Sequence, residues 1–167
     1  MLQENSKLEY RIGSSKDIHK LSLNRKLMLG GVHVPSLFGE VAHSDGDVVY
    51  HALSEAILGA LALGDLGTHF PDNDAATENM DSAVIVRYVK KLMNEAGYEV
   101  NNVDVFISLE TPKLKDFIPQ MKYNISFELD IPYDAVSVKA GTNEGMGPVG
   151  EKLAVEATAT VLLKRIK

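Results

Sequence analysis

The stretch from Ala42 to Gly64, AHSDGDVVYHALSEAILGALALG, decides the fold class because it places one long amphipathic helix after a polar turn. Its apolar residues recur at spacings of three and four, the period of a single buried helix face. They are Val49, Ala52, Leu53, Ala56, Ile57, Ala60 and Leu63. We expect a helix from about Asp45 to Leu63, with Ser44 or Asp45 capping its start and Gly64 ending it.

The sequence before this helix predicts β-structure. Lys26 to Val34 reads KLMLGGVHV, two short apolar runs around a Gly30-Gly31 pair. Two glycines can both take the positive φ that a tight turn requires, so this segment is typical of a β-hairpin. Further upstream, YRI at residues 10–12 begins a strand that leads toward Asp17 and His19.

The sequence after the helix alternates helical and extended patterns. Residues 64–80 have turn composition without apolar periodicity, and a loop of this length is often functional. The later elements that we expect are a helix from Asp81 or Ser82 to Ala96, a strand at 103–107, a helix at 115–128, a strand at 135–140, a Gly-rich loop at 142–150 and a helix at 151–164. This order predicts an α+β fold in two layers, a mixed sheet packed against helices with a small hairpin.

Composition narrows the possible functions. The chain of 167 residues is 45% apolar and carries a net charge of −6, which suits one globular domain at 10–167 behind a short extension at 1–9, and disfavours nucleic acid or an anionic membrane as the main partner. It has no Cys, so thiolate nucleophiles and Cys-based metal sites are excluded and a cytoplasmic location is expected. The apolar stretch Ala56 to Gly64 is far shorter than the roughly 20 residues of a membrane span.

Six side chains that can bind metal gather in the first third of the chain: Asp17, His19, His43, Asp45, Asp47 and His51. In extended backbone, residues two apart point to the same side, so Asp17 and His19 can reach one ion. On the helix, Asp47 lies one turn before His51 and Glu55 one turn after it, so either carboxylate could orient an imidazole. Three N and O ligands with an open position are typical of catalytic zinc. Taken singly, each histidine is more often an ordinary surface or core residue.

These residues form part of a longer series of motifs. It comprises Arg11-Ile-Gly, Asp17-Ile-His19, Gly30-Gly-Val, AHSDGDVVYHAL at 42–53, ALGDLGTHFPDND at 62–74, Asn102-Val-Asp, Pro112-Lys113, Ile118-Pro-Gln-Met121 and Val138-Lys-Ala. In this order the series resembles the 2-C-methyl-D-erythritol 2,4-cyclodiphosphate synthases of the non-mevalonate isoprenoid pathway. The resemblance runs from about residue 10 to residue 165.

The resemblance implies a homotrimer with active sites between adjacent subunits. In this family the enzyme, a phosphorus-oxygen lyase, converts 4-diphosphocytidyl-2-C-methyl-D-erythritol 2-phosphate to the cyclic diphosphate and CMP. The positions matching Asp17, His19 and His51 hold a divalent metal, usually zinc, and the position matching Glu144 helps to hold magnesium or manganese at the substrate diphosphate. Those matching His43 and Thr142 support the transferring phosphoryl group. The 2-phosphate is itself a nucleophile, so positioning and charge neutralisation suffice.

The resemblance also assigns substrate contacts to three parts of the chain. The metal-side contacts are Asp17, Ile18, His19, His43 and Ser44. The contacts to the methylerythritol part are Asp65, Leu66, Gly67, Phe70, Pro71, Asp72, Asn73 and Asp74. The contacts to the cytidine and its diphosphate are Leu109, Pro112, Lys113, Leu114, Lys115, Ala140, Gly141, Thr142, Asn143 and Glu144.

Some positions depart from the family pattern and leave alternatives open. Pro148 stands where the family has an aromatic residue, and Glu151 where it has an Arg; the neighbouring Lys152 would point elsewhere on a helix. One alternative is therefore a relative that binds zinc and a cytidine nucleotide but turns over slowly or not at all. Another is a zinc-dependent phosphohydrolase with Asp47 or Glu55 as general base.

Overall fold

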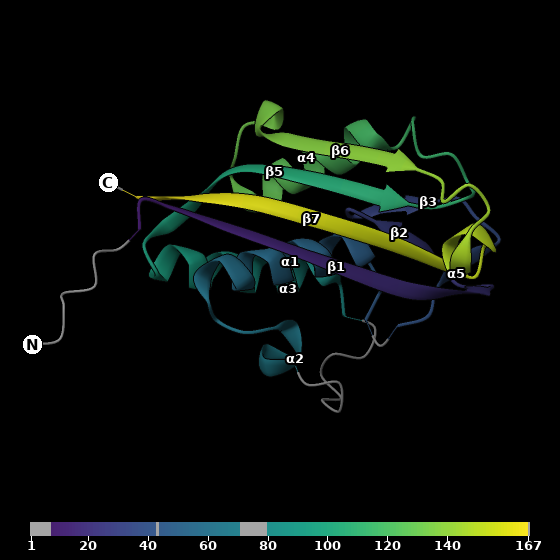
Figure 1. Ribbon diagram of the computed structural model, residues 1–167, viewed down its shortest axis with the longest axis horizontal. Coiled ribbons are helices and arrows are strands. Elements are labelled where there is room, and N and C mark those ends of the chain that lie inside the picture. Colours follow the sequence, from purple (N-terminus) through teal and green to yellow (C-terminus); the bar gives the residue numbers. More distant parts are fainter. Residues whose placement is uncertain (1–7, 43, 71–79, 167) are drawn as a thin grey trace, which may run out of the picture.

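A computed structural model describes residues 8–42, 44–70 and 80–166. The fold is built on a five-stranded sheet, and Figure 1 labels β1, β7, β5 and β6 of this sheet. The strands lie in the order β4-β1-β7-β5-β6, with bounds Phe38–Glu40, Tyr10–Leu23, Ala154–Arg165, Tyr98–Ser108 and Val136–Gly141. Only β5 and β6 run parallel; the other neighbouring strands pair antiparallel. A separate hairpin is formed by β2 (Leu27–Leu29) and β3 (Val32–Val34).

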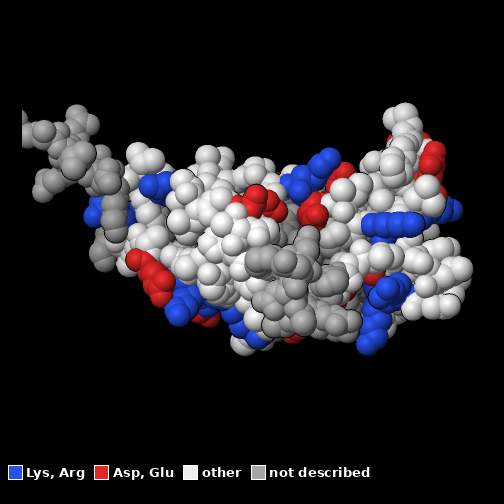
Figure 2. All heavy atoms as spheres, turned by 90° about the horizontal axis from the view of Figure 1, so that it is seen from below, with Lys and Arg blue, Asp and Glu red and all other residues white. Residues whose placement is uncertain are grey.

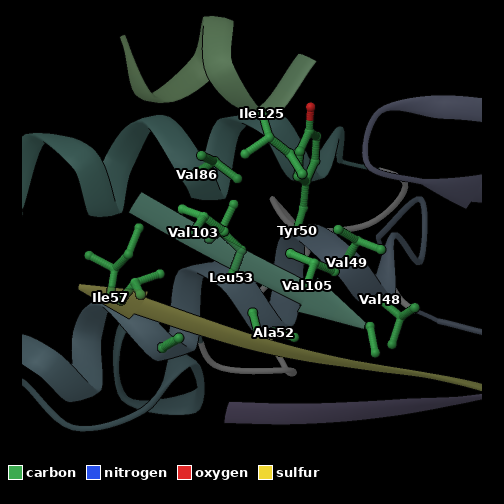
Figure 3. Packing of buried hydrophobic residues seen from close by; sticks show 14 of the residues in the cluster. Val48, Val49, Tyr50, Ala52, Leu53, Ile57, Val86, Val103, Val105 and Ile125 are labelled. Carbon is green, nitrogen blue, oxygen red and sulfur yellow. The ribbon is translucent and has the colours of Figure 1, made fainter. Parts of the chain in front are cut away.

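Three helices cover one face of the sheet: α1 (Val48–Leu61), α3 (Ser82–Glu95) and α4 (Ile118–Leu129). Within the described residues, short helices of one turn lie in the connections: α2 (Leu66–His69), the 3-10 helix η2 (Tyr133–Ala135) and α5 (Gly147–Gly150). Figure 3 shows the core between the layers, where Leu53 and Ile57 of α1 meet Val103 of β5, Val86 of α3 and Ile125 of α4. The α+β class and the two-layer architecture are confirmed.

The predicted hairpin is confirmed, and its turn is fixed by a buried carboxylate. Gly30 and Gly31 have φ values of 58° and 72°. Their N–H groups donate to the two oxygens of Asp47 at 2.9 and 2.6 Å. The hairpin is thereby held against the start of α1.

The first helix starts and ends slightly inside its expected bounds. Asp47, rather than Ser44 or Asp45, is the cap, because its Oδ1 accepts the N–H groups of Val49 and Tyr50 at 3.1 Å. The helix ends at Leu61, where Ala62 takes the left-handed conformation two residues before Gly64. The predictions of a Ser44 or Asp45 cap and of a Gly64 terminus are wrong.

The expected last helix at 151–164 is also wrong, since residues 154–165 form strand β7 in the middle of the sheet. The side chains alternate between the two faces, with Val155, Ala157, Ala159, Val161 and Leu163 buried. This is a period of two, favoured further by the β-branched Thr and Val residues. Lys152 therefore lies on no helix; it takes φ of 65° in the turn before β7.

The remaining elements agree with expectation in kind. Helix α3 begins after Asp81, whose side chain accepts the Ala83 N–H, and α4 begins three residues later than predicted. Strand β5 is longer than the predicted 103–107, and residues 66–69 of the predicted loop form α2. Among the described residues, no helix combines the length and the apolar character of a membrane span.

Candidate functional site

A pocket of about 490 Å³ lies where β1, α1, α2 and the start of α3 meet. Its lining combines the three predicted metal ligands with polar and apolar residues of α1, α2, α3 and the adjoining loops. The lining residues are Asp17, His19, Val41, Ala42, Ser44, His51, Glu55, Leu66, Gly67, Phe70, Met80 and Ile85.

Strand and helix geometry brings the predicted ligands together. Asp17 and His19 occupy the same side of β1, the side that faces α1. Gly13 shares that side, and a Cβ there would lie 1.9 Å from the Ala56 carbonyl oxygen, so its missing side chain allows α1 to approach closely. His51 then projects from the first turns of α1 toward Asp17.

The three side chains converge on one point. Oδ2 of Asp17 lies 3.0 Å from Nε2 of His19 and 3.3 Å from Nδ1 of His51. One ligand atom from each residue lies within 4.8 Å of the other two, and the site is half-buried. The structure thus places Asp17, His19 and His51 as a group that could hold a metal ion.

The other nitrogen of each imidazole is held by a neighbour. Nδ1 of His19 lies 2.6 Å from the Gly46 carbonyl oxygen, so this nitrogen carries the proton and donates. Nε2 of His51 lies 3.2 Å from Ser44 Oγ and 3.0 Å from Ser82 Oγ. In each ring the contact on the nitrogen that faces away from Asp17 fixes the orientation of the imidazole, as is common for histidines that bind metal.

The charges of the site are coupled. Burial raises the pKa of Asp17, but its interactions with the imidazoles of His19 and His51 outweigh it and hold that pKa well below its usual range. Burial lowers the pKa of His19, yet its interactions with Asp17 and Glu40 raise it to about 10. Without a metal, His19 is accordingly an imidazolium paired with the Asp17 carboxylate.

Glu40 is a buried carboxylate that we did not expect at this site. Its Oε1 lies 3.6 Å from His19 Nδ1 and accepts the Val48 N–H, while Oε2 accepts the Met28 N–H at 3.2 Å. Burial raises its pKa to about 8. Glu40 thus connects the hairpin and the start of α1 to the Nδ1 side of His19. It reaches this position because β4 pairs with β1 in the folded sheet.

The two carboxylates expected to orient the imidazoles have different positions. Asp47 is wholly buried and directs its oxygens to main-chain N–H groups of the hairpin and of α1, away from His51. The expectation that Asp47 orients an imidazole is therefore wrong, because its capping role occupies it. Glu55 does line the pocket, where burial and the nearby Asp17 charge raise its pKa.

Helix α2 supplies Leu66, Gly67 and, just after it, Phe70 to the pocket wall. Asp65 caps this helix: its exposed carboxylate accepts hydrogen bonds from the N–H and the hydroxyl of Thr68 at 2.9 and 2.7 Å. These two hydrogen bonds lower the pKa of Asp65. His43, Pro71, Asp72, Asn73 and Asp74 lie outside the described residues.

The residues expected to bind cytidine form a second cluster, at the carboxyl ends of β5 and β6. The Leu109 N–H donates to the Gly141 carbonyl at 3.0 Å, and the Asn143 N–H donates to Glu110 Oε1 at 2.6 Å. Thr142 Oγ1 lies 3.2 Å from Glu144 Oε1. Leu114 is buried, whereas Lys113 and Lys115 are exposed. Glu110 holds the two loops together, and no pattern in the sequence predicts this contact.

None of residues 109–115 or 140–144 is among the described residues that line the metal pocket. Pro112, Ala140, Thr142 and Glu144 belong to the second cluster only, on the far side of β7 from β1. One chain therefore brings together the metal-side residues but keeps the cytidine-side residues apart from them.

The molecular surface carries both signs of charge. On the face shown in Figure 2, which is seen from the side of α2, Lys and Arg side chains are interspersed with Asp and Glu side chains and with uncharged surface. A bound polyanion on such a surface needs local positive charge from ions or hydrogen-bond donors.

Comparison with known proteins gives consistent matches over almost the whole chain. The YgbB family model matches residues 10–164. A 2-C-methyl-D-erythritol 2,4-cyclodiphosphate synthase of Fusobacterium nucleatum is 45% identical over 157 residues, covering 94% of this chain and 98% of that protein. The enzyme of the same name from Salinibacter ruber is 49% identical, covering 90% and 98%. The Plasmodium falciparum IspF structure in complex with CDP has a TM-score of 0.84 at 37% identity, covering 95% and 97%.

Proposed function

We infer the function of this chain from the premise that it belongs to the YgbB family. It carries out the cyclodiphosphate-forming step of the non-mevalonate isoprenoid pathway, making 2-C-methyl-D-erythritol 2,4-cyclodiphosphate and CMP from the cytidylyl-linked 2-phosphate. The observation that supports this most directly is the convergence of Asp17, His19 and His51 in a pocket beside α2. In reaction terms we propose a phosphorus-oxygen lyase acting in the cytoplasm, in keeping with a chain free of Cys.

The reaction needs positioning more than proton transfer. The 2-phosphate oxygen attacks the β-phosphorus of the diphosphate, one P–O bond forms and the bond to CMP breaks, so CMP leaves with the electron pair. A phosphate dianion needs no general base. The chain's share is to hold the two phosphates in line and to offset the charge on their oxygens, with His43 and Thr142 beside the transferring group.

The donor set of the pocket fits a divalent metal. Asp17 through Oδ2, His19 through Nε2 and His51 through Nδ1 would hold the ion, which we propose to be zinc, since two imidazoles and one carboxylate are typical zinc ligands. When bound, it supplies positive charge for phosphate oxygens. Glu144, exposed in the loop after β6, would help to hold magnesium or manganese with the substrate diphosphate.

The separation of the two clusters supports a site shared between subunits. The substrate carries its methylerythritol 2-phosphate and its cytidine at opposite ends, joined by the diphosphate, and one chain presents the corresponding residues in two places. The sheet face opposite the helices exposes Ile12, Ile18 and Phe106. We propose that three copies pack through this face, so that the metal side of one copy meets the cytidine side of the next.

The test is incubation of the metal-loaded protein with its substrate, with CMP followed by chromatography and the phosphorus product by ³¹P NMR. We expect CMP together with a cyclic diphosphate, and no product from the His51→Ala variant. CMP with a linear phosphate product would overturn the assignment in favour of hydrolysis. Nucleotide binding without CMP release would overturn it in favour of a non-catalytic relative, the alternative suggested by Pro148 and Glu151.

A further inference from the structure

We propose that Ser82, held in place by Asp45, is a positioning residue that fixes His51 in the tautomer with its proton on Nε2, leaving the Nδ1 lone pair for a metal. The role of Ser82 deepens the proposed function and rests on it in one respect: the bound metal is the reason why Nδ1 must be free of a proton. Neither residue is a ligand in the group of Asp17, His19 and His51.

The hydroxyl of Ser82 has one proton, and the structure commits that proton to Asp45. Ser82 Oγ makes a short hydrogen bond to Asp45 Oδ1, and the Ser82 N–H donates to Asp45 Oδ2 at 3.2 Å. A carboxylate can only accept, so the hydroxyl proton points to Asp45. The oxygen of Ser82, 3.0 Å from His51 Nε2, must then accept, and the proton of that contact belongs to the imidazole.

Asp45 is itself held rigidly. Its Oδ1 also accepts the Asp47 N–H at 3.1 Å, and its own N–H donates to the Met80 carbonyl at 3.0 Å. Ser82 is wholly buried at the first position of α3. The pair therefore joins the start of α1 to the start of α3 directly behind His51.

Ser44 alone would leave the tautomer open. Its Oγ lies 3.2 Å from His51 Nε2 and accepts the Gly46 N–H, but no contact of the described residues commits its own proton. This hydroxyl can either accept from Nε2–H or donate to a bare Nε2. Ser82, whose proton is used elsewhere, decides between the two states.

The tautomer matters because of what lies at the other nitrogen. Nδ1 of His51 lies 3.3 Å from Asp17 Oδ2, on the side of the proposed ion. A proton on Nδ1 would donate to Asp17 and would have to be removed before a metal could bind there. Loss of the Ser82 oxygen should therefore weaken metal binding, and residues that support a ligand in this way are typically worth about 10- to 100-fold in affinity.

The experiment compares Ser82→Ala with Ser126→Ala, a matched loss of a buried serine hydroxyl that bonds the Tyr123 carbonyl on α4. Long-range ¹H–¹⁵N NMR of the histidine rings in metal-free protein reports the tautomer at a pH where His51 is neutral. Competition with a chromophoric chelator gives the zinc affinity. We expect Ser82→Ala to populate the Nδ1–H form and to lose about 10-fold or more in zinc affinity, Ser82→Thr to retain both properties, and Ser126→Ala to match the wild type.

The proposal is overturned if Ser82→Ala, folded by circular dichroism, keeps the Nε2–H tautomer and binds zinc within twofold of the wild type. Should Ser82→Ala fail to fold, Asp45→Asn provides the second variant, because an amide can donate to Ser82 and free its proton to point at Nε2; an unchanged tautomer there would equally overturn the proposal. Both readouts use metal-free protein and zinc alone. A wild type that releases no CMP yet shows the tautomer and affinity effects would contradict the proposed function and leave this inference standing.

Discussion

At the scale of single residues, the site is built so that each candidate ligand has one free atom. His19 uses Nδ1 on the Gly46 carbonyl and His51 uses Nε2 on two serines, which leaves Nε2 and Nδ1, respectively, facing Asp17. Because these hydrogen bonds already fix the two imidazole rings, the rings lose little conformational freedom when they bind an ion.

We expect His51→Ala to lose zinc and turnover while the fold remains. The core is made of apolar side chains and does not include the three candidate ligands, so removing one ligand leaves it intact. The loss of activity should exceed the roughly 10- to 100-fold typical of residues that only support a ligand. Metal content by atomic emission and CMP release measure both effects. His33→Ala, at an exposed position on β3, is the control, and a His51→Ala protein with full zinc and full activity would refute the ligand assignment.

The raised pKa of His19 predicts how the metal-free protein responds to pH. The folded protein keeps this proton up to about pH 10, whereas the ordinary value for an unfolded histidine is 6.5. Between these values the folded state binds more protons, so the free energy of unfolding falls as pH rises, and the full contribution is present only below 6.5. Burial raises the pKa of Glu40 from 4.5 to about 8, so between these pH values this carboxyl also makes the free energy of unfolding fall as pH rises.

Urea unfolding of chelator-treated protein at pH 7 and pH 9 measures this slope. We expect lower stability at pH 9 and a smaller difference between the two pH values in His19→Gln. His33→Gln should behave as the wild type. Equal stability of the wild type at both pH values would show that His19 is not held protonated by its partners.

At the scale of elements, the contact between β1 and α1 determines the distance between the ligands. A Cβ on Gly13 would lie 1.9 Å from the Ala56 carbonyl oxygen and 2.9 Å from the Ala60 Cβ, so the helix would have to move away. We expect Gly13→Ala to lower the free energy of unfolding by about 1–3 kcal/mol, the usual cost of overpacking. Because α1 carries His51, the zinc affinity of the Gly13→Ala protein should fall as well.

Gly59→Ala is the matched control, on the same helix but with nothing within 4 Å of the added Cβ. It should stabilise the protein by about 0.5–1 kcal/mol, since alanine is the better helix former. Chemical denaturation of both variants gives the comparison. A Gly13→Ala protein as stable as the wild type would mean that β1 and α1 can separate without cost.

The elements also show which parts of the fold are local enough to predict. Helix α1 and the hairpin are encoded by periodicity and by Gly30-Gly31, and both were predicted. Strand β7 was not, because its Ala-rich sequence also suits a helix; its period of two becomes decisive only when β1 and β5 pair on either side of it.

The candidate site, too, is predictable from the sequence only in part. Asp17 and His19 follow from strand spacing, and His51 from its place on a predicted helix. Ser82 and Glu40 reach the imidazoles only through tertiary contacts, Ser82 from 31 residues along the chain, and no local pattern marks them. Asp47 was assigned to the wrong partner because helical spacing places it near His51 but does not show that the hairpin occupies its carboxylate.

At the scale of the whole molecule, the sheet has one covered face and one open face. Alternate residues of β1, β7 and β5 form rows across the open face, for example Lys16, Thr158 and Phe106. Ile12 and Ile18 are 72% and 46% exposed there, although they lie in the middle of a long strand. Apolar side chains exposed on a flat sheet face are suited to burial against another subunit.

We expect Ile12→Asp to dissociate the proposed trimer into monomers and to abolish CMP release, because three carboxylates would be buried in the interface without partners. Ile12 lies outside both the metal pocket and the cytidine cluster, so the lost activity would follow from the separation of the two half-sites. Phe127→Asp, at a position 65% exposed on the outer side of α4, is the matched control and should remain trimeric and active. Sedimentation velocity gives the assembly state and zinc titration shows whether the metal side is intact in the monomer. An Ile12→Asp protein that sediments as a monomer with full activity would show that one chain holds a complete site, and one that stays trimeric would place the interface on another face.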